Sequence, residues 1–213
     1  MRIRTVTGLI LGLALLFTTA TPTFAQDPMP IGVKAGLNIA TLSFDPEDED
    51  DEAESRTGLV LGVTFQKPLR ARVGLQVEAL YTQKGAKFTD DEFDFEETIR
   101  LDYIEIPVLA NVTATSTDRM SVHVLAGPSF AFNVNAKAKS EFEGVEEEED
   151  IDDEVKAADV GFIIGAAVRT GQLIFDARYN FGLMNILEDE VIDEDESVKT
   201  RTFTFSVTWL IRR

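Results

Sequence analysis

The chain contains no cysteine and only one histidine. The absence of cysteine excludes disulfides, thiolate catalysis and cysteine-ligated metal sites. A single histidine excludes a metal site built from several imidazoles. Basic residues are also few, with 20 Lys and Arg against 38 Asp and Glu, so the formal net charge is −18. Because nucleic-acid binding needs a basic footprint, we expect no nucleic-acid partner.

The first residues have the features of an export signal. Arg2 and Arg4 precede an apolar run, Val6–Phe17, which is shorter than the roughly 20 residues of a spanning helix. Thr23-Phe24-Ala25 then places small residues at the −3 and −1 positions of a cleavage point before Gln26. This pattern predicts a secretory signal peptide over residues 1–25. A membrane anchor is the alternative for the same run. A short lead at 26–30 and one domain at 31–213 would follow.

Beyond residue 30, apolar and polar residues alternate with period two, which predicts strands with unlike faces. Eight such runs cover residues 31–43, 57–66, 72–84, 98–112, 120–133, 159–169, 173–182 and 199–211. The phase of the run 98–112 slips near Tyr103, and we expect a β-bulge there. We therefore predict an all-β protein.

The connections between these runs alternate in length. Short connections (67–71, 113–119 and 170–172) take turns with long ones (44–56, 85–97, 134–158 and 183–198). In an up-and-down sheet, all short turns then lie at one end and all long loops at the other. This layout predicts an eight-stranded antiparallel up-and-down transmembrane β-barrel, with short periplasmic turns and long acidic outer loops. The predicted location is the bacterial outer membrane, after cleavage near Ala25.

The two faces of the runs indicate which side meets lipid. The apolar face is almost free of charge, and its aromatic residues gather toward both strand ends, as expected for the two membrane interfaces. The other face should fill the interior, because an eight-stranded barrel has room only for its own side chains. The charged residues predicted to form an interior polar network are Lys34, Glu78, Lys84, Arg100, Asp102, Glu105, Arg169, Asp176 and Arg178. A narrow, gated ion path is the alternative to a purely structural network.

Four segments resemble a known family: Gly32–Asn38 (GVKAGLN), Tyr103–Pro107 (YIEIP), Ala126–Pro128 (AGP) and Ala177–Leu183 (ARYNFGL). In this order they are similar to the small outer-membrane β-barrel family of Bacteroidota and their relatives. That family is also described as PorT-like or porin-family barrels and is akin to the OmpA transmembrane domain. The resemblance covers about residues 31–211 and implies an eight-stranded barrel in the outer membrane. It implies no single activity.

The long connections are strongly acidic and hold 31 of the 38 acids. Such runs repel themselves and stay hydrated, so we expect mobile loops. Clustered carboxylates also suit hard cations such as Ca²⁺. The weak candidate ligands are Asp48, Glu49, Asp50, Asp51, Glu147, Glu148 and Asp150. A solvated cell-surface exterior without a site is the other interpretation of these runs, and it is the one we favour.

Parts of the sequence also fit two other functional classes, an enzyme and a soluble ligand-binding barrel. His123 shares a strand face with Ser121, and a Ser–His pair can support nucleophilic catalysis when a third group orients the base. A lone strand histidine is more often structural, so we predict no enzyme and no cofactor. A soluble secreted barrel that binds an apolar ligand would show the same periodicity, with its apolar face lining a cavity.

The function predicted from the sequence is that of an outer-membrane β-barrel with a structural, surface-interaction or minor porin-like role. Its expected partners are outer-membrane lipid and, at the loops, divalent cations. We expect a monomer.

Overall fold

The structure is a computed structural model that describes residues 30–45, 53–90, 95–142, 145–187 and 197–212. The strands in these residues are β1 (Ile31–Asp45), β2 (Glu54–Arg70), β3 (Val73–Asp90), β4 (Phe95–Ser116), β5 (Met120–Phe142), β6 (Val145–Asp150), β7 (Ala158–Thr170), β8 (Leu173–Gly182) and β9 (Ser197–Arg212). Across the same residues, no helix has the length and apolar character needed to cross a bilayer. The predicted signal peptide, residues 1–25, and the lead up to residue 29 lie outside the described residues.

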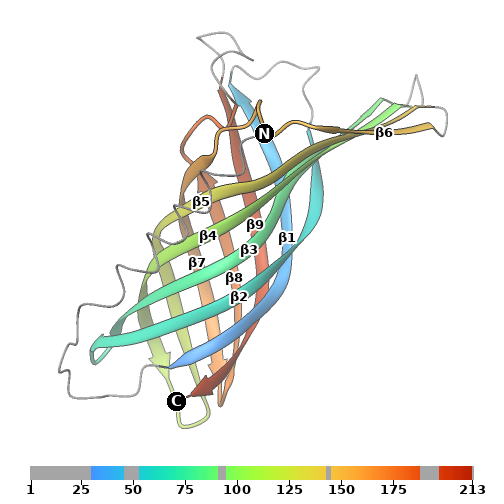
Figure 1. The fold of residues 1–213 in the computed structure, drawn as a ribbon. Helices are drawn as coiled ribbons and strands as arrows, with labels where there is room; N and C mark the ends of the chain where they lie inside the picture. The colour runs from blue at the N-terminus through green and yellow to red at the C-terminus, as the bar shows by residue number, and fades with distance from the viewer. Residues whose placement is uncertain (1–29, 46–52, 91–94, 143–144, 188–196, 213) are drawn as a thin grey trace.

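Eight of the strands close into a ring (Figure 1). Neighbouring strands are antiparallel in the order β1, β2, β3, β4, β5, β7, β8 and β9, and β9 pairs with β1 to close the barrel. The remaining strand, β6, pairs only with β5 and lies outside the ring. The predicted eight-stranded antiparallel up-and-down barrel is confirmed, with one strand more than predicted.

Short turns and long connections lie at opposite ends of the barrel. The short turns join β2 to β3, β4 to β5 and β7 to β8. Gly171 occupies the last of them with a φ of 58°, which glycine adopts without steric cost. Ile31 pairs with Arg212, so β1 begins and β9 ends at this same end. The prediction that short turns lie at one end of the barrel and long connections at the other is therefore confirmed.

Two of the predicted loops, 85–97 and 134–158, are largely strand in the described residues, so the prediction that these segments are loops is wrong. β3 continues to Asp90, β4 begins at Phe95, β5 continues to Phe142, and β6 occupies Val145–Asp150. These extensions pair with one another beyond the ring. We call them the outer ribbon, comprising residues 86–90, 95–101, 136–142 and 145–150. It projects sideways from the long-loop end, where Figure 1 labels β6.

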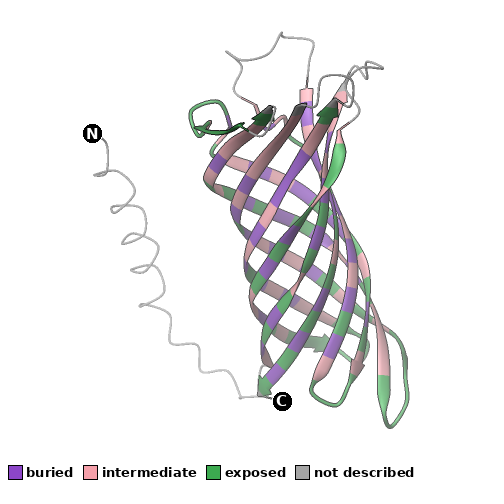
Figure 2. Ribbon diagram, turned by 90° about the vertical axis from the view of Figure 1, so that its right-hand side faces the viewer, coloured by how far each residue is buried: buried purple, intermediate pink, exposed green. Residues whose placement is uncertain are grey.

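The outward face of the barrel is apolar and the inward face carries most of the polar residues. Leu37, Phe205 and Trp209 are 50%, 52% and 54% exposed, whereas Lys34, Asn38 and Glu78 are at most 4% exposed. Figure 2 shows the result as buried and exposed bands that alternate along the strands. A soluble barrel would need the apolar face to line a cavity. Because that face points outward, the soluble-barrel alternative is wrong.

The expected bulge is present, but its extra residue lies on the neighbouring strand. Asp102 pairs with Asn135 and Tyr103 pairs with Asn133, so Val134 of β5 is the unmatched residue. β4 itself alternates without interruption, with Leu101, Tyr103 and Glu105 all buried. The apparent phase slip within 98–112 is therefore not a slip of that strand.

Candidate functional site

The barrel interior holds a compact group of buried charges from three strands that are not neighbours. Lys34 of β1 lies 2.9 Å from Glu78 of β3 and 3.1 Å from Asp176 of β8. Arg178 of β8 binds Glu78 with both Nη atoms, at 2.7 and 3.0 Å, and its Nε lies 2.7 Å from Asp176. Gln76 adds a hydrogen bond to Glu78 at 2.6 Å. These contacts tie opposite walls of the barrel together.

A second polar group lies nearer the long-loop end. Lys84 Nζ lies 3.3 Å from Glu105 Oε2 and 5.3 Å from the centre of the Tyr103 ring. Asn180 donates to the other oxygen of Glu105 at 2.7 Å. Asp159 accepts a hydrogen bond from Thr200 at 3.0 Å. The structure thus brings together Lys34, Glu78, Asp176 and Arg178 in one group, and Lys84 and Glu105 in another.

Glycines on the inner face make room for these long side chains. A Cβ atom at Gly165 would lie 2.8 Å from Cγ of Arg178. One at Gly161 would lie 2.3 Å from Oδ1 of Asn180. Both distances are too short for real atoms, so the positions of Arg178 and Asn180 depend on the absence of a side chain there.

Three residues predicted for the interior network lie elsewhere. Arg100 and Asp102 alternate with the buried Leu101 and Tyr103, so they face outward, and Asp102 accepts a hydrogen bond from Gln83 at 3.3 Å. The prediction assumed a phase slip in their own strand, and that assumption put them on the wrong side. Arg169 is on the inner face but is only half-buried, at the short-turn mouth.

The space beside the buried charges is small. A cavity beside the charged group, lined in part by Lys34, Thr82 and Arg178, has a volume of about 20 Å³. A single water molecule needs about 10–15 Å³, so this cavity holds little more than one. Around the charged group, the described interior therefore contains side chains where a porin has a water column.

Apolar side chains close the long-loop end of the barrel. Val155 and Ile186 come from the connections that follow β6 and β8, and both are buried against Leu42, Tyr103 and Val198. Backbone hydrogen bonds fix them there, from Lys156 N to Ile186 O at 2.7 Å and from Ile186 N to Val198 O at 2.9 Å. The sequence predicted an interior filled by polar side chains, and its layer at the long-loop end is instead apolar.

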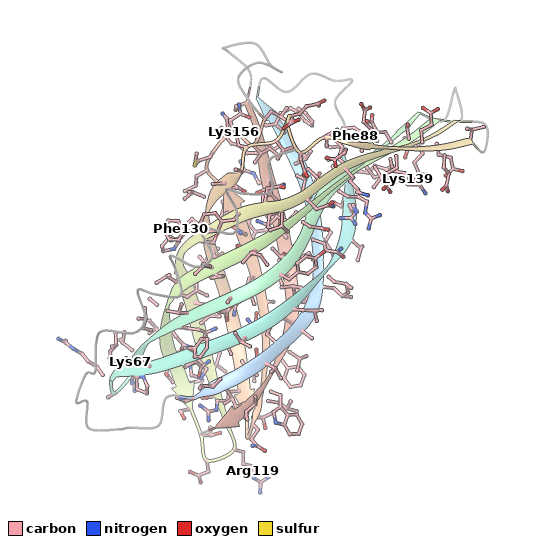
Figure 3. All side chains as sticks on the ribbon, viewed as in Figure 1. Lys67, Phe88, Arg119, Phe130, Lys139 and Lys156 are labelled. Atoms are coloured by element: carbon pink, nitrogen blue, oxygen red, sulfur yellow. The ribbon has the colours of Figure 1, made fainter. Side chains whose placement is uncertain are left out.

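The outer ribbon carries paired charges on one face. Lys139 lies 2.9 Å from Glu146, Lys87 lies 2.8 Å from Glu96, and Lys137 bonds to Glu148. The hydrogen bond from Lys137 lowers the pKa of the Glu148 carboxyl. Figure 3 shows Lys139 on the ribbon and Phe88 near its base. Such cross-strand pairs explain why an acidic run adopts a strand.

The candidate cation ligands do not gather at one point in the described residues. Asp48, Glu49, Asp50 and Asp51 lie outside them. Glu147, Glu148 and Asp150 are exposed on β6, where alternation puts Glu147 on one face and the other two on the opposite face. Among described residues, no group of three or more His, Asp and Glu side chains is placed to hold a metal ion.

His123 and Ser121 do meet, and a third residue joins them. Ser121 Oγ lies 2.8 Å from His123 Nε2, and His123 Nδ1 lies 2.8 Å from Oδ1 of Asn111. Asn111 was not among the residues predicted from the sequence to form a site. Its position on the inner face of β4, the strand that pairs with β5, could have indicated that it lies close to His123. Both ring nitrogens of His123 are thus engaged at the short-turn mouth.

A closed ring of strands with an apolar exterior, a filled polar interior and connections of unequal length at its two ends defines a transmembrane β-barrel of the outer-membrane type. The chain belongs to the outer membrane protein beta-barrel domain family, whose model matches residues 24–188. It is an outer-membrane β-barrel protein.

Solved structures similar to this chain include the following three proteins. Ail, the attachment invasion locus protein of Yersinia pestis, is 14% identical with a TM-score of 0.42, over 86% of this chain and 99% of Ail. Neisserial surface protein A is 14% identical with a TM-score of 0.45, over 84% and 96%. The outer membrane protein AlkL is 9% identical with a TM-score of 0.36, over 91% and 96%. No curated protein matches the chain.

Proposed function

We propose that this barrel acts at the cell surface through its outer ribbon and does not conduct solutes through its interior. The observation that carries the proposal is the filled barrel, with its inner cavity of about 20 Å³ and the buried Val155 and Ile186 at the outer mouth. Because a cavity of this size beside the buried charges holds little more than one water molecule, the ends of the barrel are the better candidates for function. The porin-like role is therefore the less favoured of the roles predicted from the sequence.

The ribbon favours a cationic partner. Two lysines of β5 engage Glu146 and Glu148 on one face of β6, whereas Glu147 and Glu149 project from the opposite face and stand across from Ser140 and Ala138. β6 is also the edge strand of the sheet, and an exposed edge can receive an extended peptide by strand addition. A segment rich in lysine and arginine fits this surface, and divalent cations would bind there only weakly.

The proposal also covers export of the chain, its contact with lipid and its oligomeric state. Removal of residues 1–25 at the predicted signal cleavage point would deliver the mature chain to the envelope. Outer-membrane lipid would cover the apolar belt, and the barrel would function as a monomer. Membership of the PorT-like group within the family rests on the four sequence segments described above.

Planar-bilayer recording tests the proposal directly. The purified, refolded barrel should show no discrete conductance steps at either polarity, because no continuous water path crosses the filled interior. A double variant that removes the apolar closure, Val155→Gly with Ile186→Gly, provides the comparison on the same barrel. Regular single-channel steps from the unaltered protein would contradict the proposal.

A peptide-binding assay tests the proposed preference of the outer ribbon for a cationic partner. Barrels in nanodiscs of neutral lipid should bind an oligolysine peptide in a salt-dependent manner and should not bind an oligoglutamate peptide. Glu147→Gln with Glu149→Gln should weaken the oligolysine interaction. Unchanged binding in that variant would place the contact elsewhere.

A further inference from the structure

The short-turn end of the barrel is basic, although the chain as a whole is strongly acidic. Lys67, Arg70, Arg72, Arg119 and Arg169 all lie at or next to the three short turns. The single acid within those turns is Asp118. Figure 3 shows Lys67 and Arg119 at this end, opposite the ribbon. The positive potential is therefore concentrated where the barrel opens toward the periplasm.

A pocket of about 190 Å³ opens at this end. Four cationic residues are among those that line it, Lys67, Arg70, Arg72 and Arg169, and among the described residues that line it none is acidic. The basic lining of this pocket differs from the composition of the whole chain, which has nearly twice as many acidic as basic residues. The pocket is also nearly ten times larger than the cavity beside the buried charges.

The inner wall of the pocket is polar and held in place by hydrogen bonds. His123 and Asn111 both line it, and they are bonded to each other at 2.8 Å. Asn111 also donates to Gln76 Oε1 at 2.9 Å, and Gln76 donates to the buried Glu78 at 2.6 Å. The wall is therefore connected by hydrogen bonds to the buried charged group of the barrel core. A preorganised wall lowers the cost of ordering side chains around a ligand.

From this combination we infer that the short-turn mouth is a binding pocket for a phosphate group. Guanidinium groups present paired N–H donors that match phosphate oxygens, and several of them at one opening attract an anion from solution. The mouth also lies at the periplasmic membrane surface, where phosphates are present both in solution and on lipid headgroups. The inference concerns the end opposite the proposed surface function and does not depend on it.

Phosphorus NMR titration on the refolded full barrel in an uncharged detergent tests the inference with inorganic phosphate as the probe. We expect saturable broadening or shift at physiological ionic strength. In Arg70→Gln with Arg72→Gln and Arg169→Gln, the apparent affinity should fall by at least about tenfold, because the loss of a single charge-assisted hydrogen bond is already worth about a factor of ten. Arg72→Gln alone, in an exposed turn, gives a second variant that leaves the strands unaltered.

The matched control is Arg119→Gln, which removes the same charge at the same end but outside the pocket lining. It should change the affinity less than twofold. A second arm reconstitutes the barrel into phosphatidylcholine vesicles with and without phosphatidylglycerol and repeats the titration. Competition by phosphatidylglycerol would assign the pocket to lipid headgroups, whereas titration unaffected by it would assign the pocket to free phosphate. No saturable binding in either arm, or an equal loss in Arg119→Gln, would overturn the inference.

Discussion

Individual charged side chains inside the barrel are removed from water and depend on one another. Glu78 receives both Nη atoms of Arg178 and also contacts Lys34. Breaking a buried ion pair from one side leaves the other charges uncompensated, which typically costs about 3–5 kcal/mol. The arrangement therefore makes Glu78 a residue whose charge, rather than its volume, holds three strands together.

We expect Glu78→Gln to lower the free energy of unfolding by about 3–5 kcal/mol, since the amide keeps the size of the side chain and removes its charge. Urea unfolding in lipid vesicles, followed by the fluorescence of Trp209, the only tryptophan, measures this. Glu96→Gln is the control, because its pair with Lys87 is partly exposed and such pairs contribute only about 0–1 kcal/mol. Equal effects of the two substitutions would show that the buried group is not tightly coupled.

A backbone position gives a second prediction at this scale. Gly85 has a φ of 129°, beside the register shift between β2 and β3, and a Cβ there would lie 2.0 Å from Ile99 O. We expect Gly85→Ala to destabilise the barrel by about 1–3 kcal/mol. Gly74→Ala, whose nearest neighbour would be Lys67 O at 3.2 Å, should be much milder in the same urea titration. A Gly85→Ala variant as stable as Gly74→Ala would contradict the assigned strain.

The side of a residue could be predicted from the sequence wherever alternation was unbroken. Lys34, Glu78 and Arg178 were placed inward correctly because their neighbours alternate cleanly. Arg100 and Asp102 were placed on the wrong face, because the prediction assumed a one-residue shift within their own strand. Such a shift moves every side chain of a strand to the opposite face. The extra residue, Val134, lies on β5, and nothing in the run 98–112 alone could reveal a bulge in its partner.

At the scale of whole elements, the outer ribbon is the part that the sequence did not predict. Its acidic strand, β6, was interpreted as a hydrated loop because charge runs usually are. The missing information was its partner, in which Ala136-Lys137-Ala138-Lys139 continues the period-two pattern past the predicted strand end. Propensity within the acidic run itself points away from a strand, so pairing across strands decides its structure.

Reversing the charges on one strand should therefore release β6. With Lys137→Glu and Lys139→Glu, the two new carboxylates would repel those of β6. We expect β6 to separate from β5 while the ring of eight strands stays closed. Limited proteolysis should then cut within residues 143–157 several times faster, with an unchanged barrel core. Adding Glu146→Lys and Glu148→Lys should restore protection. Protection that survives the first double variant would contradict a pairing based on charge.

For the molecule as a whole, apolar side chains cover the outward face of the barrel and polar side chains fill most of its interior, which is the reverse of a soluble protein. The predicted architecture was accurate at this scale because period, connection lengths and the uncharged face all depend on local sequence. The closure of the outer mouth was not predicted, because Val155 and Ile186 reach it from connections that show no periodicity.

A charged substitution on the outward face tests this distribution. Leu37 is 50% exposed in the middle of β1, so Leu37→Arg would be nearly neutral in a soluble barrel. In a bilayer it should destabilise the fold by about 2–4 kcal/mol, falling to about 0–1 kcal/mol near the interfaces. Ile211→Arg, at the end of β9, supplies the interfacial control in the same vesicle unfolding assay. Equal costs at the two positions would contradict the membrane placement.

The opposite charges of the two ends have a consequence for how copies share a membrane. An acidic ribbon on one side and a basic mouth on the other make each molecule an electric dipole along the membrane normal. Copies inserted in the same direction present like charges to each other at both surfaces and repel laterally, over a screening length of about 8 Å at physiological ionic strength. We therefore expect the lateral spacing of these barrels to depend on salt concentration, with wider spacing in dilute media and closer approach in saline media.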